Sequence, residues 1–300
     1  MQTIIIMILL FGSNGWIGSK VIQLLKDKNI PIQSAVSRAD DITSIRKEIE
    51  EHKSITPITH IMSFIGRTHG VYENEKITTI DYLEKPGKLV DNVRDNLYAP
   101  VSLALLCKEL NIHFTYLGTG CIFEYDENHP YGSEETGFLE ISSPNFFGSS
   151  YSIVKGFTDQ LMQQLPVLNV RIRMPITHEY HERNFITKIT NYKKVCSIPN
   201  SMTVLNELLP MMLELTLRKE VGTINLTNPG VITHNEILEM YKEIVDPSFT
   251  WENFTQEEQN TILLSKRSNN CLDTTVLQQY FPQVKTIKES VREMLTQMKL

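Results

Sequence analysis

The heptapeptide GSNGWIG, at positions 12–18, limits the possible folds of this chain more than any other feature. It follows an apolar run and leads directly into a helical pattern. Glycine at its first, fourth and seventh positions permits a positive φ and lets the backbone approach a ligand closely. The helix that starts here offers unpaired N–H groups and the positive end of its dipole, which together suit a diphosphate.

A strand before the glycines and a helix after them form the setting that a dinucleotide-binding turn requires. The loop therefore predicts a dinucleotide site, and a tight turn without a ligand is the alternative. The residues expected to bind the cofactor here are Gly12, Asn14, Gly15, Trp16, Ile17 and Gly18.

Strand and helix patterns alternate along the first half of the chain, which predicts an α/β fold with a Rossmann-type, doubly wound parallel sheet. We expect a dinucleotide-binding domain at 1–166 and a smaller, closely packed substrate-binding domain at 167–300. The expected strands are 4–11, 32–37, 58–64, 112–117, 167–174 and 222–227. The expected helices are 16–28, 42–52, 87–110, 184–192, 203–219, 234–245, 274–280 and 286–299.

Charge and composition exclude several classes of protein. The chain of 300 residues has a net charge of −6 and no long basic run, which argues against nucleic-acid binding. Its apolar first ten residues are short and lack a basic segment, so they are interpreted as a buried strand and not as a signal peptide. No membrane segment is expected. The four cysteines show no paired spacing and indicate free thiols in a reducing compartment, the cytoplasm.

The end of the second expected strand bears on the choice of dinucleotide. An acidic residue there would hold a free ribose 2′-hydroxyl. This chain instead has Ser37 and Arg38, a pair that suits a 2′-phosphate. We therefore expect NADPH, with NADH as the alternative because Asp40 follows closely. A solvated loop charge is the other interpretation of Arg38.

Tyr151 and Lys155 lie four residues apart and would share one face of a helix. A lysine ammonium near a phenol favours the phenolate, and such a tyrosine can exchange a proton with a carbonyl oxygen. An ordinary pair on a helix surface is the alternative. Together with Thr119, the pair resembles the Thr/Ser–Tyr–Lys set of the extended short-chain dehydrogenases/reductases. Asn96 falls where that superfamily often has an asparagine on its central helix.

Cys121, in GTGCIFEYD, is not needed for simple reduction and points to a second reaction. A ketone at C4 of a sugar acidifies the hydrogens on C3 and C5, so that a base can form an enolate there. Tyr151 and Thr119 would hold the resulting oxyanion. A thiolate is a competent base when nearby positive charge stabilises it. A small buried residue is the alternative interpretation of Cys121.

Long blocks of the sequence resemble the bifunctional UDP-4-keto-6-deoxy-D-glucose 3,5-epimerase/4-reductases, which complete UDP-L-rhamnose synthesis in plants and some large viruses. The resemblance runs from about residue 8 to residue 293 and is carried by GSNGWIG, TGCIFEYD, SPNFFGSSYSIVK, RNFITKIT and SIPNSMTVLNELLP, among other blocks. It implies reduction with NADPH by Thr119, Tyr151 and Lys155, and epimerisation by Cys121. The implied product is UDP-β-L-rhamnose.

The resemblance also implies a proton donor and a set of substrate contacts. Related GDP-fucose synthases pair their cysteine with a histidine, and RNFITKIT places Lys188 near that position, as an acid partner or as a surface lysine. Substrate contacts are expected from Asn96, Gly120, Asn145, Asn228 and Arg267. No metal site is expected, because His178 and His181 lack further ligands at metal spacing.

Other functions stay open at this point. They are a dTDP-4-dehydrorhamnose reductase without epimerase activity, a GDP-fucose synthase-like epimerase/reductase, and a non-catalytic NADP-binding sensor. The reductases usually have Ser-Thr-Asp where this chain has Gly118, Thr119 and Gly120.

A separate 4,6-dehydratase is expected to supply UDP-4-keto-6-deoxy-glucose, in the host cytoplasm if the protein is viral. A homodimer through the helices near 87–110 and 149–163 is a further hypothesis.

Overall fold

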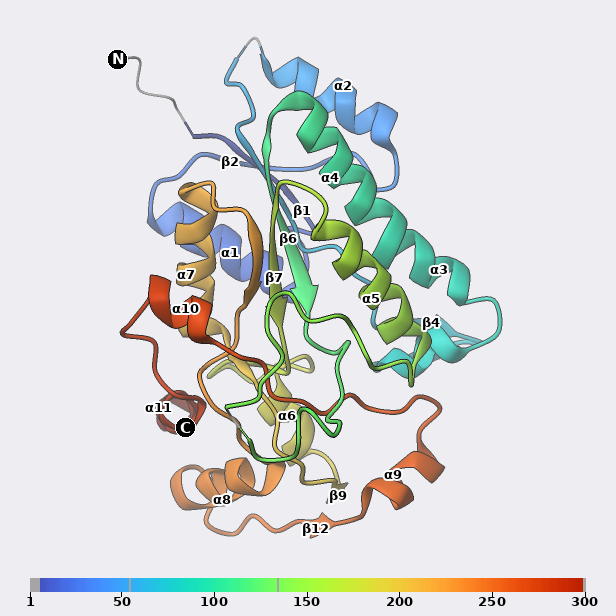
Figure 1. Cartoon of the computed structure of the whole chain (residues 1–300), viewed down its shortest axis with the longest axis vertical. Helices are drawn as coiled ribbons and strands as arrows, with labels where there is room; N and C mark the ends of the chain where they lie inside the picture. Colours follow the sequence, from blue (N-terminus) through green and yellow to red (C-terminus); the bar gives the residue numbers. More distant parts are fainter. Residues whose placement is uncertain (1–5, 54, 134, 299–300) are drawn as a thin grey trace. The chain divides into compact units, whose positions relative to one another are not determined.

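A six-stranded sheet, with the strand order β11-β7-β6-β3-β1-β2, forms the centre of the computed structural model (Figure 1). The structure describes residues 6–53, 55–133 and 135–298. The chain adds β2 on one side of β1 and then β3 on the other, and these pairs are parallel, as is the pair β3–β6. This reversal of direction is typical of a doubly wound fold and confirms the predicted class. The strands are β1 (Ile8–Phe11), β2 (Ile32–Ser34), β3 (His60–Ser63), β6 (His113–Thr119), β7 (Val167–Ile172) and β11 (Gly222–Asn225).

The chain divides into two compact units that are interleaved in sequence. The first comprises Met1–Gly118, Ser149–Val170 and Met212–Thr223. The second comprises Thr119–Gly148, Arg171–Met211 and Ile224–Leu300. This differs from a single division after residue 166, because β6 and β7 begin in the first unit and end in the second.

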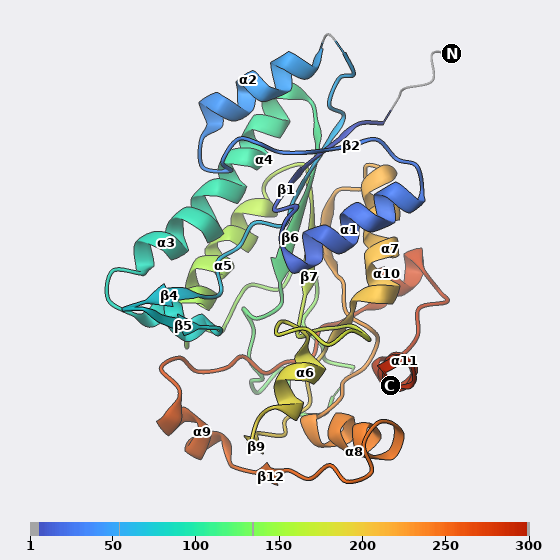
Figure 2. The ribbon, with the colours of Figure 1, turned by 180° about the vertical axis from the view of Figure 1, so that it is seen from behind.

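Helices pack on both faces of the sheet in the first unit. α2 (Ile42–Lys53), α4 (Ala99–Leu110) and α5 (Ser150–Met162) lie on one face, and α1 (Trp16–Asp27) lies on the other (Figures 1 and 2). Apolar side chains pack between the sheet and the first group, with Leu9, Ile61 and Leu103 at 0% exposure. Strand residues with both faces covered must be apolar on both, which explains the uninterrupted apolar run of β1.

The long helix expected at 87–110 contains a π-helical turn. α3 (Leu89–Val93) continues through η2 (Arg94–Tyr98), a π-helix, into α4. Pro100 has no N–H to donate to the carbonyl of Asn96, four residues earlier, so the regular ladder cannot continue there. The Thr158 hydroxyl donates to that carbonyl instead, at 2.6 Å. The widened turn thus joins the helix firmly to α5.

The helix expected from residue 203 begins two residues later. Thr203 and Val204 form β10 (Thr203–Val204), which pairs in parallel with β8 (Pro175–Ile176). The Thr203 N–H donates to the Arg173 carbonyl at 2.9 Å, and its hydroxyl donates to the Leu226 carbonyl at 2.8 Å. Both bonds hold this residue in extended backbone, so α7 (Leu205–Leu217) starts only after it.

The second unit has its own apolar core, formed by short helices. Ile186, Ile237 and Val291 are fully buried in it. The helices expected in this region are confirmed as α6 (Phe185–Thr190), α8 (His234–Ile244), α10 (Thr275–Tyr280) and α11 (Ile287–Met298). Several elements of the chain were not expected from the sequence. They are the hairpin β4 (Gly70–Tyr72) and β5 (Glu75–Ile77), the 3-10 helix η1 (Ile80–Glu84), the pair β9 (Lys194–Val195) and β12 (Glu252–Asn253), and α9 (Gln256–Ile262). Within the described ranges, no helix is long and apolar enough to cross a membrane.

Two buried histidines make the folded state sensitive to acid. His60 and His113 are register partners on β3 and β6, and their ring centroids lie 5.4 Å apart. Burial, with a smaller contribution from the charge of Lys219, lowers the pKa of each to about 4. A histidine in the unfolded chain takes up its proton near pH 6.5. Between these values the unfolded state binds more protons, so stability must fall as the pH falls.

We therefore expect the free energy of unfolding to decrease between pH 7 and pH 5 by on the order of 1–2 kcal/mol for each of these two histidines. Urea unfolding at several pH values measures this decrease. Histidine NMR signals over the same range should show both rings neutral in the folded protein. A free energy of unfolding that stays constant between pH 7 and pH 5 would contradict the assignment.

Candidate active site

The glycine loop has the backbone geometry that a bound diphosphate requires. Gly12 adopts φ +80°, in the left-handed region. A Cβ on Gly18 would lie 2.1 Å from the Gly12 carbonyl oxygen, so only glycine allows the helix to start this close to the turn. Gly15 is the N-cap of α1 and provides no side-chain cap. The first N–H groups of α1 are therefore available to an anion, and the loop fits the predicted dinucleotide.

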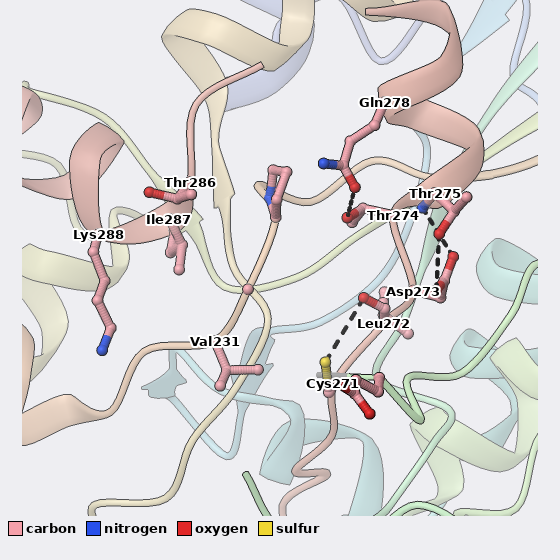
Figure 3. A pocket seen from close by; sticks show the side chains of 13 residues that line it. Val231, Cys271, Leu272, Asp273, Thr274, Thr275, Gln278, Thr286, Ile287 and Lys288 are labelled. Carbon is pink, nitrogen blue, oxygen red and sulfur yellow. Dashed lines mark hydrogen bonds between the residues drawn. The ribbon is translucent and has the colours of Figure 1, made fainter. Parts of the chain in front are cut away.

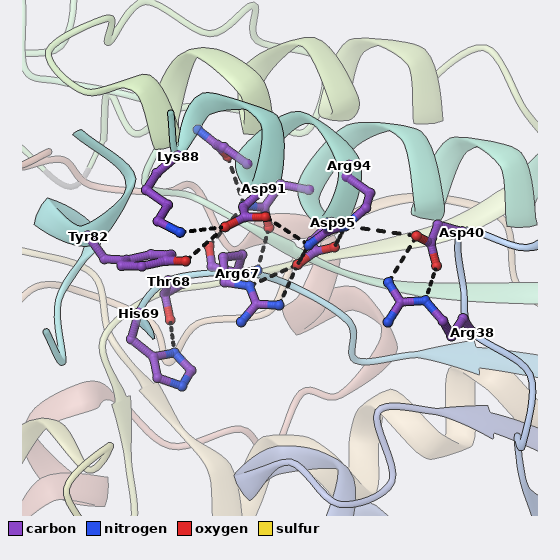
Figure 4. Close-up of polar contacts among 12 residues, drawn as sticks. Arg38, Asp40, Arg67, Thr68, His69, Tyr82, Lys88, Asp91, Arg94 and Asp95 are labelled. Carbon is purple, nitrogen blue, oxygen red and sulfur yellow. Dashed lines mark hydrogen bonds and ion pairs between the residues drawn. The ribbon is translucent and has the colours of Figure 1, made fainter. Parts of the chain in front are cut away.

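Arg38 lies in a network of charges after β2 (Figure 4). Its guanidinium forms two 3.0 Å bonds to the carboxylate of Asp40, and Arg94 lies 3.8 Å from the same carboxylate. The bond from Arg38 keeps the pKa of Asp40 below its usual value. The Arg38 side chain is 70% exposed, so a phosphate from solvent can reach it.

Glu48 fixes the backbone of the same loop. Its carboxylate accepts the N–H groups of Val36 and Ser37 at 2.8 and 2.9 Å. The N–H of Ser37 is thus already used, and its hydroxyl is the group that it can offer to a ligand. Sequence reasoning missed Glu48, because its role depends on a contact between α2 and the loop.

Tyr151 and Lys155 lie on α5 as predicted and are 9% and 4% exposed. Ser149 caps the helix by accepting the N–H of Ser152 at 3.0 Å, which fixes where α5 begins. Lys155 donates a hydrogen bond to the hydroxyl of Tyr116, and its Nζ lies 4.6 Å from the centroid of that ring. Burial raises the pKa of Tyr116 well above its usual value, with Tyr151 and Asp159 adding to the effect. Tyr116 is therefore a neutral phenol that holds the buried ammonium.

Thr119 and Cys121 are joined at the end of β6. Thr119 is the last residue of the strand and is 7% exposed, and its hydroxyl oxygen accepts the N–H of Cys121 at 3.0 Å. The four cysteines are free thiols, and Cys121 is half-buried whereas the other three are buried. Burial raises the pKa of Cys107 and of Cys196. The structure therefore singles out Cys121 as the accessible thiol.

Lys188 lies on α6, whose first N–H groups are capped by Asn184. Its side chain is partly buried. Burial lowers the pKa of Lys188, and the neighbouring charges of Arg183 and Arg267 lower it further. A lysine with a lowered pKa gives up its proton more readily near neutral pH, as an acid partner must. Arg267 donates from Nη1 to the carbonyl of Ser265 at 2.9 Å, so its guanidinium is anchored beside Lys188.

Asn96, which was expected to contact the substrate, is buried and bonded to protein partners. It is 1% exposed, and its side-chain oxygen accepts the N–H of Arg67 at 2.9 Å. Its amide nitrogen donates to the Arg67 carbonyl and to Asn92, both at 2.9 Å. The side chain therefore ties the π-helical turn to the segment after β3.

Asn228 and Asn145 also bond to the protein rather than present free amides. Asn228 is fully buried and bonds to Val204, Glu207 and Ser290. Asn145 accepts the N–H of Glu124 and donates to its carbonyl, both at 2.9 Å, so it fixes the loop after Cys121. These bonds use the polar atoms that a sugar would need.

Gly120, which was also expected to contact the substrate, is closely packed. A Cβ at this position would lie 2.6 Å from Leu272 Cδ1 and 3.0 Å from Arg173 Cγ and Cδ. Its carbonyl accepts hydrogen bonds from Arg173 and from Asn270, each at 3.0 Å. Glycine is needed here because the stem of a buried arginine crosses the backbone.

The second unit also contains a cavity. A cavity of about 780 Å³ is lined by residues of 229–231, 271–275 and 286–288, and no predicted site residue lines it (Figure 3). Among the described residues, no cluster of three or more His, Cys, Asp or Glu side chains is arranged to hold a metal ion. His178 accepts from or donates to Asn206 at 3.0 Å, and His181 accepts the N–H of Arg183 at 3.0 Å.

The glycine loop, the Tyr151–Lys155 pair and the doubly wound sheet define a dinucleotide-dependent short-chain dehydrogenase/reductase of the extended type. Solved structures of low identity share this fold. A dTDP-4-dehydrorhamnose reductase of Bacillus anthracis in complex with NADP has a TM-score of 0.75 at 16% identity, over 96% of this chain and 98% of that chain. The Bordetella bronchiseptica enzyme WbmH in complex with NAD⁺ has a TM-score of 0.70 at 12% identity, over 95% of both chains.

Sequence relatives identify the particular family. Protein L780 of Acanthamoeba polyphaga mimivirus is 52% identical over 293 residues, which are 97% of this chain and 98% of that protein. Its crystal structure, described as a UDP-rhamnose synthase, has a TM-score of 0.91 over 97% of this chain and 99% of that chain, at 51% identity. A bifunctional dTDP-4-dehydrorhamnose 3,5-epimerase/reductase of Arabidopsis thaliana is 43% identical over 285 residues, 94% of this chain and 90% of that protein. The chain belongs to this family of bifunctional 3,5-epimerase/4-reductases of UDP-rhamnose synthesis.

A third relative is a longer protein. A trifunctional UDP-glucose 4,6-dehydratase/3,5-epimerase/reductase of Arabidopsis thaliana is 42% identical over 94% of this chain, which corresponds to 41% of that protein. No protein-family model matches the chain.

Proposed function

We propose that this chain converts UDP-4-keto-6-deoxy-D-glucose to UDP-β-L-rhamnose, by epimerisation at C3 and C5 followed by reduction at C4. The observation that carries the proposal is the half-buried thiol of Cys121 at the end of β6, tied to Thr119 by a 3.0 Å bond. A plain reductase does not need that thiol. Membership of the epimerase/reductase family and the fold shared with L780 support the same reaction.

Epimerisation needs a base on one face of the sugar ring and an acid on the other. At each of the two centres, C3 and C5, the thiolate of Cys121 removes the proton, and the electrons of the C–H bond move into an enolate whose negative charge rests on O4. Lys188 then delivers a proton to the opposite face, which inverts the centre. The lowered pKa of Lys188 supports this role, because a donor must release its proton to a carbon near neutral pH.

Reduction uses a second set of groups. The bound cofactor supplies a hydride to C4. Tyr151 donates its phenolic proton to O4 as the alcohol forms, and the hydroxyl of Thr119 donates a hydrogen bond to the same oxygen. The ammonium of Lys155 stabilises the phenolate that Tyr151 becomes, and the Tyr116 hydroxyl holds that ammonium in place.

We propose NADPH as the preferred cofactor, since Arg38 is an exposed cation at the position where a 2′-phosphate would lie.

A separate dehydratase is proposed to supply the 4-keto substrate, as the dehydratase segment of the trifunctional plant relative suggests. A reducing compartment, the cytoplasm, is proposed as the location, in keeping with four free thiols. The plant bifunctional relative is named for a dTDP sugar, so both nucleotides are to be compared as substrates.

The epimerase half of the proposal predicts proton exchange without the cofactor. On incubation with UDP-4-keto-6-deoxy-glucose in D₂O, and without NADPH, the protein should introduce deuterium at both C3 and C5 of the sugar, measured by NMR. Cys121→Ala should lower this exchange by at least about 100-fold, because the general base is removed.

Tyr151→Phe is the matched control for that experiment. It should retain measurable exchange while its reduction of the keto sugar with NADPH falls by at least about 100-fold. Normal UDP-rhamnose formation by Cys121→Ala would show that the thiol is not the base. An absence of exchange, with NADPH oxidised only when an epimerised substrate is supplied, would identify a plain reductase.

The cofactor assignment predicts a change of preference in the Arg38→Ala variant. Its Kd for NADPH should rise by about 10-fold or more, which is the usual value of a charge-assisted hydrogen bond, and its Kd for NADH should change little. Isothermal titration calorimetry with both cofactors measures this. Asp40→Asn should instead tighten NADPH binding, because it frees Arg38 and removes a negative charge. Equal effects of Arg38→Ala on both cofactors would exclude a contact with the 2′-phosphate.

We also propose a homodimer through α4 and α5. Leu105 on α4 is 52% exposed, and Phe157 and Leu161, one helical turn apart on α5, are 56% and 44% exposed. Light scattering at micromolar concentration should give twice the 34.5 kDa mass of one chain, and Phe157→Glu should shift the mass to that of a monomer. Leu264→Glu changes an equally exposed residue of the other unit and should leave the dimer intact. A monomer mass for the unchanged protein would exclude the dimer.

A further inference from the structure

Arg173 is a buried cation whose partners carry no formal charge. It follows β7 directly and is 1% exposed. Its Nη1 donates to the Gly120 carbonyl and to Ser268 Oγ, both at 3.0 Å. Its Nη2 donates to Asn200 Oδ1 at 2.6 Å and to the Ser268 carbonyl at 3.0 Å. No carboxylate among the residues that the structure describes forms an ion pair with it.

Such a group is costly, because a charge removed from water is normally paired with an opposite charge. Burial lowers the pKa of Arg173, and negative charge on Cys121, foremost among its neighbours, acts in the opposite direction. The four neutral acceptors bond to Nη1 and Nη2 without cancelling the charge, and the buried Nε has no hydrogen-bond partner among the described residues. Its electrostatic field therefore acts on whatever lies nearby.

Cys121 is a neighbour of this charge. The Gly120 carbonyl that accepts from Arg173 belongs to the peptide bond that leads into Cys121, and Asn270 donates to the same oxygen at 3.0 Å. On its other side, Cys121 is held by the bond from its N–H to Thr119. The stem of Arg173 can lie this close because residue 120 has no Cβ. The backbone of the thiol is thus fixed against the guanidinium.

From this geometry we infer that Arg173 is the positioning residue of the epimerase. It holds a fixed positive charge beside Cys121, without a competing carboxylate, and stabilises the thiolate that removes the sugar protons. This role rests on the proposed function of Cys121 as the base. Arg173 itself touches neither sugar nor cofactor in this account.

The other titratable groups around Arg173 do not replace that charge. Tyr125 donates its hydroxyl to the Pro199 carbonyl at 3.0 Å, and Cys271 lies with its Sγ 3.8 Å from the Leu272 carbonyl. On the loop after Cys121, burial raises the pKa of Glu124, and Lys266 opposes that change. Arg173 is the cation bonded directly to the peptide of Cys121.

The experiment measures the ionisation of Cys121 without using its activity. The protein is alkylated with iodoacetamide over a range of pH, and the modified Cys121 peptide is quantified by mass spectrometry, which separates it from the three buried cysteines. Because only the thiolate reacts, the midpoint of this profile reports the ionisation of Cys121. In Arg173→Gln the midpoint should rise by about 1 pH unit or more, as expected on loss of an opposite charge. Arg173→Lys keeps the positive charge, so the midpoint of its alkylation profile should rise by no more than about half of that shift.

Arg171→Gln is the matched control. Arg171 is also fully buried and lies two residues earlier on β7, but it bonds to the Leu139 carbonyl and to Asn225. Its replacement should destabilise the protein without moving the midpoint of Cys121. Deuterium exchange should follow the same order, with Arg173→Gln slowed about 10-fold at pH 7 and recovering at higher pH as the thiol ionises.

Asn200→Asp provides a second test if Arg173→Gln does not fold. It leaves Arg173 in place and puts a carboxylate where Nη2 now donates at 2.6 Å, so it should also raise the midpoint. An unchanged midpoint in the folded Arg173 or Asn200 variants would overturn the inference and leave Cys121 as base untouched. The opposite outcome is a shifted midpoint in the variants together with no deuterium exchange by the unchanged protein. That outcome would refute the proposed epimerase activity but not the effect of Arg173 on Cys121.

Discussion

The C-terminal ends of parallel strands are the constraint on which the functional part of this molecule depends. Gly12 follows β1, Arg38 follows β2, Thr119 ends β6 and Arg173 follows β7. In a parallel sheet the hydrogen-bonded register fixes where each strand stops, and therefore where the first free side chain begins. Helices packed on both faces hold the strands in place. The chemistry of this chain is therefore set by strand lengths as much as by residue types.

Features that depend on local spacing could be predicted from the sequence. The glycine loop is defined by the spacing of its three glycines between a strand and a helix. Tyr151 and Lys155 share a face of any helix that contains both residues. The partners of Asn96 and Asn228 could not be predicted, because the sequence of an asparagine's own segment gives no indication of what its amide bonds to. Each turned out to be buried, with its amide bonded to segments far away in sequence. The π-helical turn before Pro100 was missed for a similar reason, since the Asn96 carbonyl accepts a hydrogen bond from Thr158 on α5, far away in sequence.

Arg173 could have been noticed in the sequence RIRMPI, where two arginines alternate in a strand that is otherwise apolar. A charged residue in a strand that is buried on both faces requires a specific set of partners. The sequence does not reveal whether those partners are carboxylates, which would cancel the charge, or carbonyl and hydroxyl groups, which would not. The acceptors of Arg173 are of the second kind, and Lys155 likewise has the neutral phenol of Tyr116 as a partner. Neutral acceptors hold a cation in place and leave its field available to a neighbour.

An epimerase that is also a reductase has to meet two opposite demands at one pH. In the proposed mechanism Cys121 loses its proton to act as a base, whereas Tyr151 keeps its proton until O4 receives the hydride. A single cation near both groups would favour ionisation of both, which would help the first reaction and harm the second. Arg173 and Lys155, the cations proposed to act on the thiol and on the phenol, belong to different compact units. An unperturbed tyrosine has a much higher pKa than an unperturbed cysteine, so a positive charge of the same strength brings a thiol closer to ionisation at neutral pH than a phenol. That difference in intrinsic acidity is what allows one chain to combine both reactions without a switch between them.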